Sequence, residues 1–130
     1  MKALGLDIGD KKIGYAIADT DLRIAIPKGV FDIGTRDEKI QKIFQFVQDE
    51  NIELIVVGMP YNLKGEIGHQ AHKVELFLKY MKREISLPLE IIDERLSSKI
   101  AGGGDDDAVA AAIILQTYLD RNYPVTGEDL

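Results

Sequence analysis

A carboxylate follows an apolar run near the start of the chain and stands directly before a glycine turn. The run is Leu4-Gly5-Leu6-Asp7-Ile8-Gly9, and Asp10 and Lys11 continue the turn. A buried strand rarely contains an aspartate without a partner, because an unpaired ionised carboxylate in apolar surroundings must find a cation, a hydrogen-bond donor or a proton. The pattern therefore predicts a strand that carries Asp7 to the edge of a sheet, where metal and phosphate chemistry is often done.

Length and composition set the class of protein. With 130 residues, of which 45% are hydrophobic, residues 1–130 suit a single domain with its own core. The absence of cysteine excludes disulfides and thiolate metal sites. The apolar runs have the length of strands and Met1–Leu4 is too short to open a signal peptide, so we expect a cytoplasmic protein that does not bind membranes. The net charge of −6 argues against nucleic-acid binding through a bulk positive field, although it allows a local basic patch.

The spacing of apolar residues predicts an orderly change from strands to alternating helices and strands. Three early strands indicate an antiparallel meander, with Pro27 making the third irregular. The later alternation of helix and buried strand is typical of parallel pairing, so the chain is predicted to be an α/β protein with a mixed five-stranded sheet flanked by helices. The predicted elements are strands over 3–8, 12–19 and 23–31, a helix over 36–50, a strand over 54–57 that ends at Gly58, a helix marked by Ile67, Ala71, Val74, Leu78 and Met81, a strand over 89–92 and a helix over about 105–120.

Two further acidic stretches stand where this sheet would bring them toward Asp7. The strand over 89–92 leads into Asp93-Glu94-Arg95, so a carboxylate again follows the carboxyl end of a strand. Neighbouring side chains point to opposite faces, so only one of Asp93 and Glu94 is expected to face Asp7. Asp105-Asp106-Asp107 opens an alanine-rich helix that is able to approach the sheet closely.

Three carboxylates at one point would form a site for hard divalent cations. Mg²⁺ and Mn²⁺ prefer oxygen ligands, and two such ions can activate water and stabilise a leaving oxygen, so the implied chemistry is phosphodiester hydrolysis. Each acid also has a structural explanation. An aspartate before glycine can cap a turn, a helix start favours acids, and Asp93-Glu94-Arg95 can form a surface ion pair. Three independent structural explanations are less economical than one site.

The motifs resemble those of the YqgF (RuvX-like) family. The matching residues are Gly5-Leu6-Asp7-Ile8-Gly9, Lys12-Ile13-Gly14, Val56-Val57-Gly58-Met59-Pro60, Asp93-Glu94-Arg95-Leu96-Ser97, and Asp107 with Ala110-Ala111 and Ile114-Leu115-Gln116-Thr117-Tyr118-Leu119. The resemblance implies a ribonuclease H-like fold and a metal-dependent nuclease. It implies processing of the 5′ end of the 16S ribosomal RNA precursor or, alternatively, resolution of Holliday junctions in branched DNA. It also assigns Asp7, Glu94 and Asp107 to catalysis and to holding Mg²⁺ or Mn²⁺.

Other residues are candidates for contact with a nucleic-acid substrate. An aromatic side chain in a loop after a strand can stack on a base, lysines can meet the phosphate backbone, and Arg95 can bind a phosphate through two hydrogen bonds. Loop connectors and exposed lysines are also common without any such role. The candidate substrate contacts are Lys11, Lys12, Tyr61, Asn62, Lys64 and Arg95.

One segment departs from the family pattern. Members of the family that the chain resembles have a longer basic stretch before the last helix, whereas this chain has Ser98–Gly104, which ends in three glycines. We interpret the segment near Gly102–Gly104 as a shortened or engineered linker. Such a replacement would leave the fold and the acids in place. It would lower substrate affinity, because contacts between basic residues and phosphates supply most non-specific nucleic-acid affinity.

Two other functional classes fit parts of the sequence. The first strand and turn also resemble the phosphate-binding opening of the actin and sugar-kinase superfamily, but such proteins grip a nucleotide between two domains and this chain has the length of one. A catalytically silent interaction module that keeps the fold is the other class. The sequence does not separate RNA from DNA substrates or indicate an oligomeric state.

Overall fold

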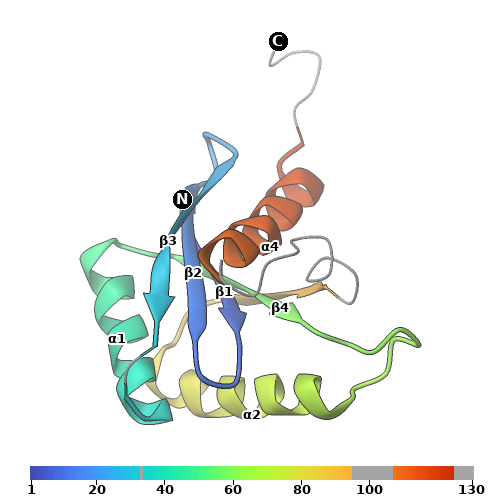
Figure 1. Cartoon of the computed structure of the whole chain (residues 1–130). Helices are drawn as coiled ribbons and strands as arrows, with labels where there is room; N and C mark the ends of the chain where they lie inside the picture. Colours follow the sequence, from blue (N-terminus) through green and yellow to red (C-terminus); the bar gives the residue numbers. More distant parts are fainter. Residues whose placement is uncertain (33, 95–106, 125–130) are drawn as a thin grey trace.

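The protein is built on a twisted five-stranded sheet with strand order β3-β2-β1-β4-β5 (Figure 1). The computed structural model describes residues 1–32, 34–94 and 107–124. Strands β1 (Lys2–Ile8), β2 (Ile13–Asp19) and β3 (Ile24–Phe31) form an antiparallel meander. Strands β4 (Leu54–Met59) and β5 (Leu89–Asp93) extend the sheet in parallel from β1. The predicted mixed five-stranded sheet is confirmed.

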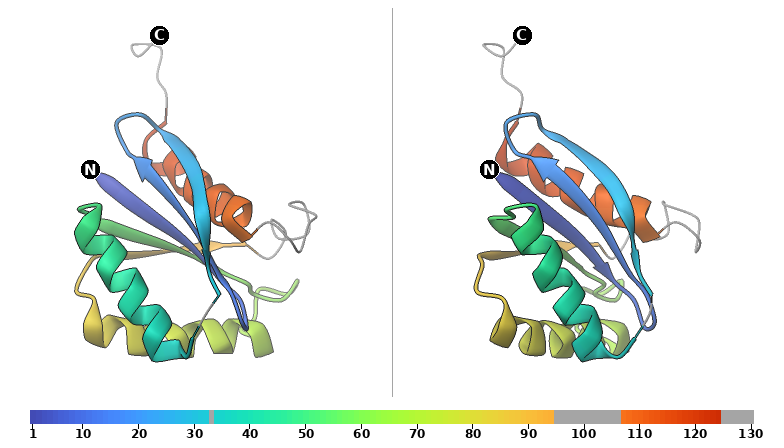
Figure 2. Two further views of the ribbon diagram at one scale, coloured as in Figure 1. Left: turned by 60° about the vertical axis from the view of Figure 1, so that its left-hand side comes forward. Right: turned by 90° about the vertical axis from the view of Figure 1, so that its left-hand side faces the viewer.

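Helices cover both faces of the sheet. Helices α1 (Arg36–Asp49) and α2 (His69–Glu84) lie on one face, and α4 (Asp107–Asn122) crosses the other (Figure 2). Helix α1 begins with a reciprocal capping box, in which the Thr35 hydroxyl accepts from the Glu38 N–H and the Glu38 carboxylate accepts from the Thr35 N–H. This local signal explains why the predicted and observed starts of α1 agree.

Two predicted boundaries need correction. The apolar spacing places Ile67 in the second helix, but α2 begins at His69 and the Ile67 side chain is 53% exposed in the preceding loop. Gly68 is the extended N-cap of α2, so Ile67 falls outside the helical repeat despite its matching spacing. Strand β4 is predicted to end at Gly58, whereas its pairing with β5 continues to Met59. Gly58 is therefore a strand residue.

The two sheet faces of β1 differ in the size of their side chains. Leu4, Leu6 and Ile8 point into the core beneath α1 and α2. On the opposite face, Ala3 packs in the smaller core beneath α4, and Gly5 lies against Leu115 of that helix. This alternation places Asp7 on the α4 face, at the carboxyl end of β1.

Some predictions lie outside the residues that the structure describes. These are the phosphate-binding role of Arg95, the linker assignment at Gly102–Gly104 and the first two residues, 105 and 106, of the predicted last helix. Within residues 1–32, 34–94 and 107–124, the helices are too short and too polar for any of them to cross a membrane.

Candidate carboxylate site

Asp7 has a glycine beside it on each neighbouring strand. On β2, Asp7 pairs directly with Gly14 in the antiparallel register. On β4, the parallel register pairs Leu6 with Val57, so Gly58 comes next beside Asp7. The half-buried Asp7 side chain therefore points from the sheet between two positions that have no side chain of their own.

Gly14 provides the space that brings Asp107 to the site. A Cβ atom at Gly14 would lie only 1.9 Å from the carbonyl oxygen of Asp107, the first residue of α4 that the structure describes. One turn along the helix, a Cβ atom at Gly5 would lie 2.9 Å from the Ala111 carbonyl oxygen. Real Cβ atoms do not approach backbone so closely, so α4 can contact the sheet in this way only over glycine. The start of α4 is thereby fixed beside Asp7.

Gly58 provides equivalent space for Glu94 on the other side. A Cβ atom at Gly58 would lie 2.6 Å from the Glu94 carboxyl carbon and 2.7 Å from its Oε1. The Glu94 N–H donates to the Met59 carbonyl oxygen at 3.2 Å, which holds the chain next to β4 as it leaves β5. Glu94 is only 4% exposed, whereas Asp93 is exposed at the end of β5. Of the two adjacent acids, Glu94 is the one that folds over the sheet toward Asp7.

Burial and mutual repulsion raise the pKa values of two of these acids. The pKa of Asp7 is raised to about 6, first by burial and then by the negative charge of Asp107. The pKa of Glu94 is raised to about 8, first by burial and then by the charges of Asp7 and Asp93. Asp7 thus interacts with both other acids, and the structure brings together the three carboxylates that the motifs single out. Their fully ionised form needs a compensating positive charge.

The structural explanations for these acids account for little of the geometry. The β1–β2 turn is closed by its own backbone, through a 2.9 Å hydrogen bond from the Gly9 N–H to the Lys12 carbonyl oxygen. Glu94 is only 4% exposed, so its carboxylate does not lie on the surface as a solvent-exposed pair requires. A helix start explains an acid at Asp107, but it does not explain why Gly14 opens the sheet beneath that residue.

The donor chemistry fits a hard divalent cation. Carboxylate oxygens are the ligands that Mg²⁺ and Mn²⁺ prefer, whereas zinc favours nitrogen and sulfur. The raised pKa values show that the site accumulates negative charge in a partly desolvated position. Among the described residues, no three ligand side chains already stand close enough to enclose an ion.

The predicted substrate contacts occupy different surroundings. Lys11 and Lys12 are exposed in the β1–β2 turn, close to Asp7 in the chain. Tyr61 packs partly against the core beneath α1 and α2. The Asn62 Oδ1 accepts hydrogen bonds from the N–H groups of Lys64 at 3.0 Å and Glu66 at 2.9 Å, so this side chain organises its own loop.

The spacing roles of Gly14 and Gly58 did not emerge from sequence reasoning. Both glycines lie in the matched motifs, and an isolated glycine within a strand often marks a close approach by another group. The sequence signal is therefore present, but the identity of the approaching group depends on tertiary structure.

Comparisons with known sequences give a consistent family. A sequence profile described as "RuvX: Holliday junction resolvase" matches residues 1–121. A Synechocystis protein named as a candidate pre-16S rRNA nuclease is 45% identical over 96 residues, covering 74% of this chain and 63% of that protein. A Chloroflexus aurantiacus protein of the same name is 39% identical over 98 residues, covering 75% and 64%. The chain thus spans less than two thirds of the length of these two relatives. A Natranaerobius thermophilus protein of that name is 32% identical over 134 residues, covering 93% and 95%.

Solved structures of two resolvases have a similar fold. Thermus thermophilus RuvC in complex with a Holliday junction substrate aligns with a TM-score of 0.61 at 17% identity, covering 93% of this chain and 94% of that chain. The fowlpox virus resolvase in complex with Holliday junction DNA aligns with a TM-score of 0.56 at 13% identity, covering 93% and 98%. At these identities the likeness establishes the fold alone, which is ribonuclease H-like as the motifs imply.

Proposed function

The chain belongs to the RuvX family, and from that premise we propose that it is a nuclease that hydrolyses phosphodiester bonds. The observation that carries the proposal is the arrangement around Asp7. Two glycines on the neighbouring strands admit Asp107 and Glu94, so three acids converge at one sheet edge. Glu94 is buried beside Asp7 with its pKa raised to about 8, and a strongly perturbed acid next to a second carboxylate supports a functional role.

We assign Asp7, Glu94 and Asp107 to holding Mg²⁺ or Mn²⁺. When bound, these ions supply water activation and stabilise charge on the leaving oxygen. Asp7 stands on a strand buried within the sheet, so its position is rigid. Glu94, with its raised pKa, keeps a proton at neutral pH until a positive charge arrives and must then release it. Asp107 completes the set from the start of α4.

The names of the relatives favour an RNA substrate. Proteins 32–45% identical to this chain are named as candidate pre-16S rRNA nucleases, so we propose action near the 5′ end of the 16S ribosomal RNA precursor in the cytoplasm. The family description and the RuvC likeness favour branched DNA as the second candidate. In either case we assign backbone contacts to Lys11, Lys12, Lys64 and Arg95, with Tyr61 and Asn62 lining the same edge.

Cleavage of labelled substrates tests this function. Single-stranded RNA, duplex DNA and a four-way junction are incubated with Mn²⁺ and the parent chain, Asp7→Asn, or a variant with a basic segment inserted at Gly102–Gly104. We expect cleavage by the parent or the restored variant, and its loss when Asp7→Asn is introduced into whichever chain cuts. Cleavage by the restored variant alone would identify the short segment as the cause of weak substrate binding. If neither the parent nor the restored variant cuts any substrate, the nuclease assignment fails and a non-catalytic interaction module becomes the better account.

A further inference from the structure

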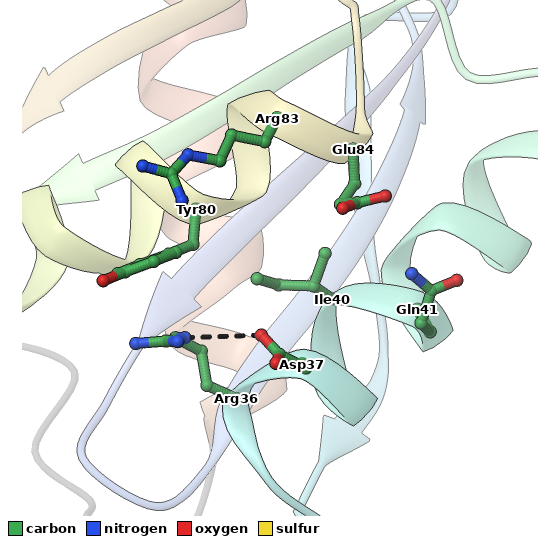
Figure 3. Close-up of a pocket in the computed structure, with 7 residues that line it drawn as sticks. All are labelled: Arg36, Asp37, Ile40, Gln41, Tyr80, Arg83 and Glu84. Atoms are coloured by element: carbon green, nitrogen blue, oxygen red, sulfur yellow. Dashed lines mark ion pairs between the residues drawn. The ribbon is translucent and has the colours of Figure 1, made fainter.

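A polar groove separates α1 from α2 on the sheet face opposite α4 (Figure 3). Its volume is about 250 Å³. The α1 side contributes Arg36, Asp37, Ile40 and Gln41, and the α2 side contributes Tyr80, Arg83 and Glu84.

Two guanidinium groups in this groove share one aromatic ring. The Arg36 Cζ lies 3.5 Å from the centre of the Tyr80 ring, and the Arg83 Cζ lies 4.9 Å from the same point. Stacking on a ring restrains a guanidinium group while leaving its N–H groups free to donate in its own plane. Both arginines are therefore held in position before any ligand arrives.

The acids of the groove leave much of this positive charge available. Asp37 pairs with Arg36 through the guanidinium Nε, at 3.5 Å from the Asp37 Oδ1. Arg83 forms no ion pair with any residue that the structure describes. In Figure 3 the Glu84 carboxylate lies on the opposite side of Ile40 from both guanidinium groups. Although the chain has a net charge of −6, this groove concentrates positively charged, preorganised hydrogen-bond donors that can bind an anion.

The groove shares Arg36 with a second cavity, which is lined by residues that follow Asp7 in the chain. Arg36 also lines a second cavity of about 200 Å³, together with Ile8, Gly9 and Lys73. Lys73 spans to the β1–β2 turn, where its Nζ lies 3.0 Å from the Asp10 Oδ1. Arg36 thus lies between the two-arginine groove and a cavity that begins at the end of β1, the strand that carries Asp7.

We propose that the Arg36–Tyr80–Arg83 groove binds phosphate groups of the nucleic-acid backbone, as a substrate-binding site separate from the three carboxylates. This inference rests on the proposed nuclease function. Guanidinium groups match phosphate oxygens through paired N–H donors, and two groups on one ring lie within reach of the same or adjacent phosphates. The groove extends the substrate contact from the sheet edge onto α1 and α2.

Binding of labelled single-stranded RNA without divalent ions tests the groove independently of cleavage. The test protein carries Arg36→Gln and Arg83→Gln. The control carries Lys42→Gln and Lys79→Gln, which remove the same charge from the same two helices at exposed positions outside the groove. We expect the arginine variant to bind several-fold more weakly, and the slope of log affinity against log salt to fall by roughly 0.7 for each phosphate that the variant no longer neutralises. The control should retain most of the affinity and slope.

Competition with inorganic pyrophosphate separates a backbone site from a site for small phosphate compounds. We expect pyrophosphate to displace RNA from the parent more readily than from the arginine variant. Equal RNA binding by the arginine variant and the control would overturn the proposal. So would loss of pyrophosphate binding with RNA binding unchanged, because the groove would then serve a small phosphate compound.

A second pair of substitutions tests the groove if the first variant does not fold. If the glutamine variant unfolds, Arg36→Lys with Arg83→Lys keeps the charge but removes the paired donors, and weaker RNA binding at an unchanged unfolding temperature is the expected result. RNA binding equal to that of the parent would count against the groove. The cleavage assay with Asp7→Asn is independent of this binding assay. If Asp7→Asn abolishes cleavage while the arginine variants bind RNA as the parent does, the groove proposal fails and the proposed nuclease function stands.

Discussion

At the scale of single residues, the candidate site depends on which of the adjacent acids Asp93 and Glu94 points toward Asp7. Sequence motifs identify Asp7 and the Asp93-Glu94 pair, because acids at the ends of apolar strands are conspicuous. The choice between Asp93 and Glu94 is a tertiary matter, since the chain has already left β5 at Glu94 and is held by Met59. Strand alternation alone cannot resolve that choice.

The contribution of Glu94 to stability should fall with rising pH when no divalent ion is present. The folded pKa of Glu94 is about 8 against an ordinary value of 4.5, so between these values the folded state binds more protons than the unfolded state. Stability is therefore highest below about pH 4.5 for this group and is lost as the pH rises through 8. Urea unfolding of the parent and Glu94→Gln, with a chelator present, measures the effect. We expect the difference to move in favour of Glu94→Gln by on the order of a few kcal/mol between acid and alkaline conditions. A difference in unfolding free energy that does not change with pH would show that the pKa of Glu94 is not raised in the folded state.

At the scale of elements, close contact between α4 and the sheet positions Asp107. The order of elements and most boundaries follow from apolar spacing and from local caps such as the one at Thr35. Ile67 misleads because its spacing matches a helix that begins only after Gly68. A glycine within a strand signals a close approach at Gly14, but the approaching group cannot be predicted from that signal, because it comes from a helix at the far end of the chain.

Gly14→Ala should disturb the fold and the site together. The new methyl group would meet the Asp107 carbonyl oxygen 1.9 Å away, and backbone cannot yield as a flexible side chain can. Overpacking of this kind costs roughly 1–3 kcal/mol or more, and α4 must move away from Asp7. Gly29→Ala on the edge strand β3 is the control, because the atoms nearest to its methyl group belong to the Tyr15 side chain, at 3.3 Å or more. Denaturant unfolding compares the two variants; equal stability would mean that α4 does not rest on Gly14.

At the scale of the whole molecule, the ribonuclease H-like sheet brings distant segments to one edge. β1, the end of β5 and the start of α4 meet there, and one cavity of the α1–α2 face, lined by Ile8, Gly9 and Arg36, lies at the same edge. The fold class was predictable because strand order follows from a meander and alternating elements. The Arg36–Tyr80–Arg83 stack was not, because it depends on how α1 lies against α2.

Mn²⁺ should raise the unfolding temperature of the intact chain. A ligand present at about 100 times its dissociation constant stabilises a protein by about 2.7 kcal/mol if it binds only the folded state. Protons compete for Glu94 and Asp7, so the stabilisation should be larger above pH 8 than near pH 6. Thermal unfolding with and without Mn²⁺ at the two pH values measures it. A shift of equal size in Asp7→Asn would place the ion elsewhere.

Calorimetric titration of Mn²⁺ into the parent and Asp7→Asn, above pH 8, most directly tests whether the three acids form a cation site. We expect the parent to bind Mn²⁺ with release of protons, because Glu94 and Asp7 have raised pKa values. Repeating the titration in buffers of different ionisation enthalpy counts the protons released. Asp7→Asn should lose most of the affinity. Equal Mn²⁺ affinity in the two proteins, or no binding by the correctly folded parent, would contradict the assignment of Asp7, Glu94 and Asp107 as a metal site.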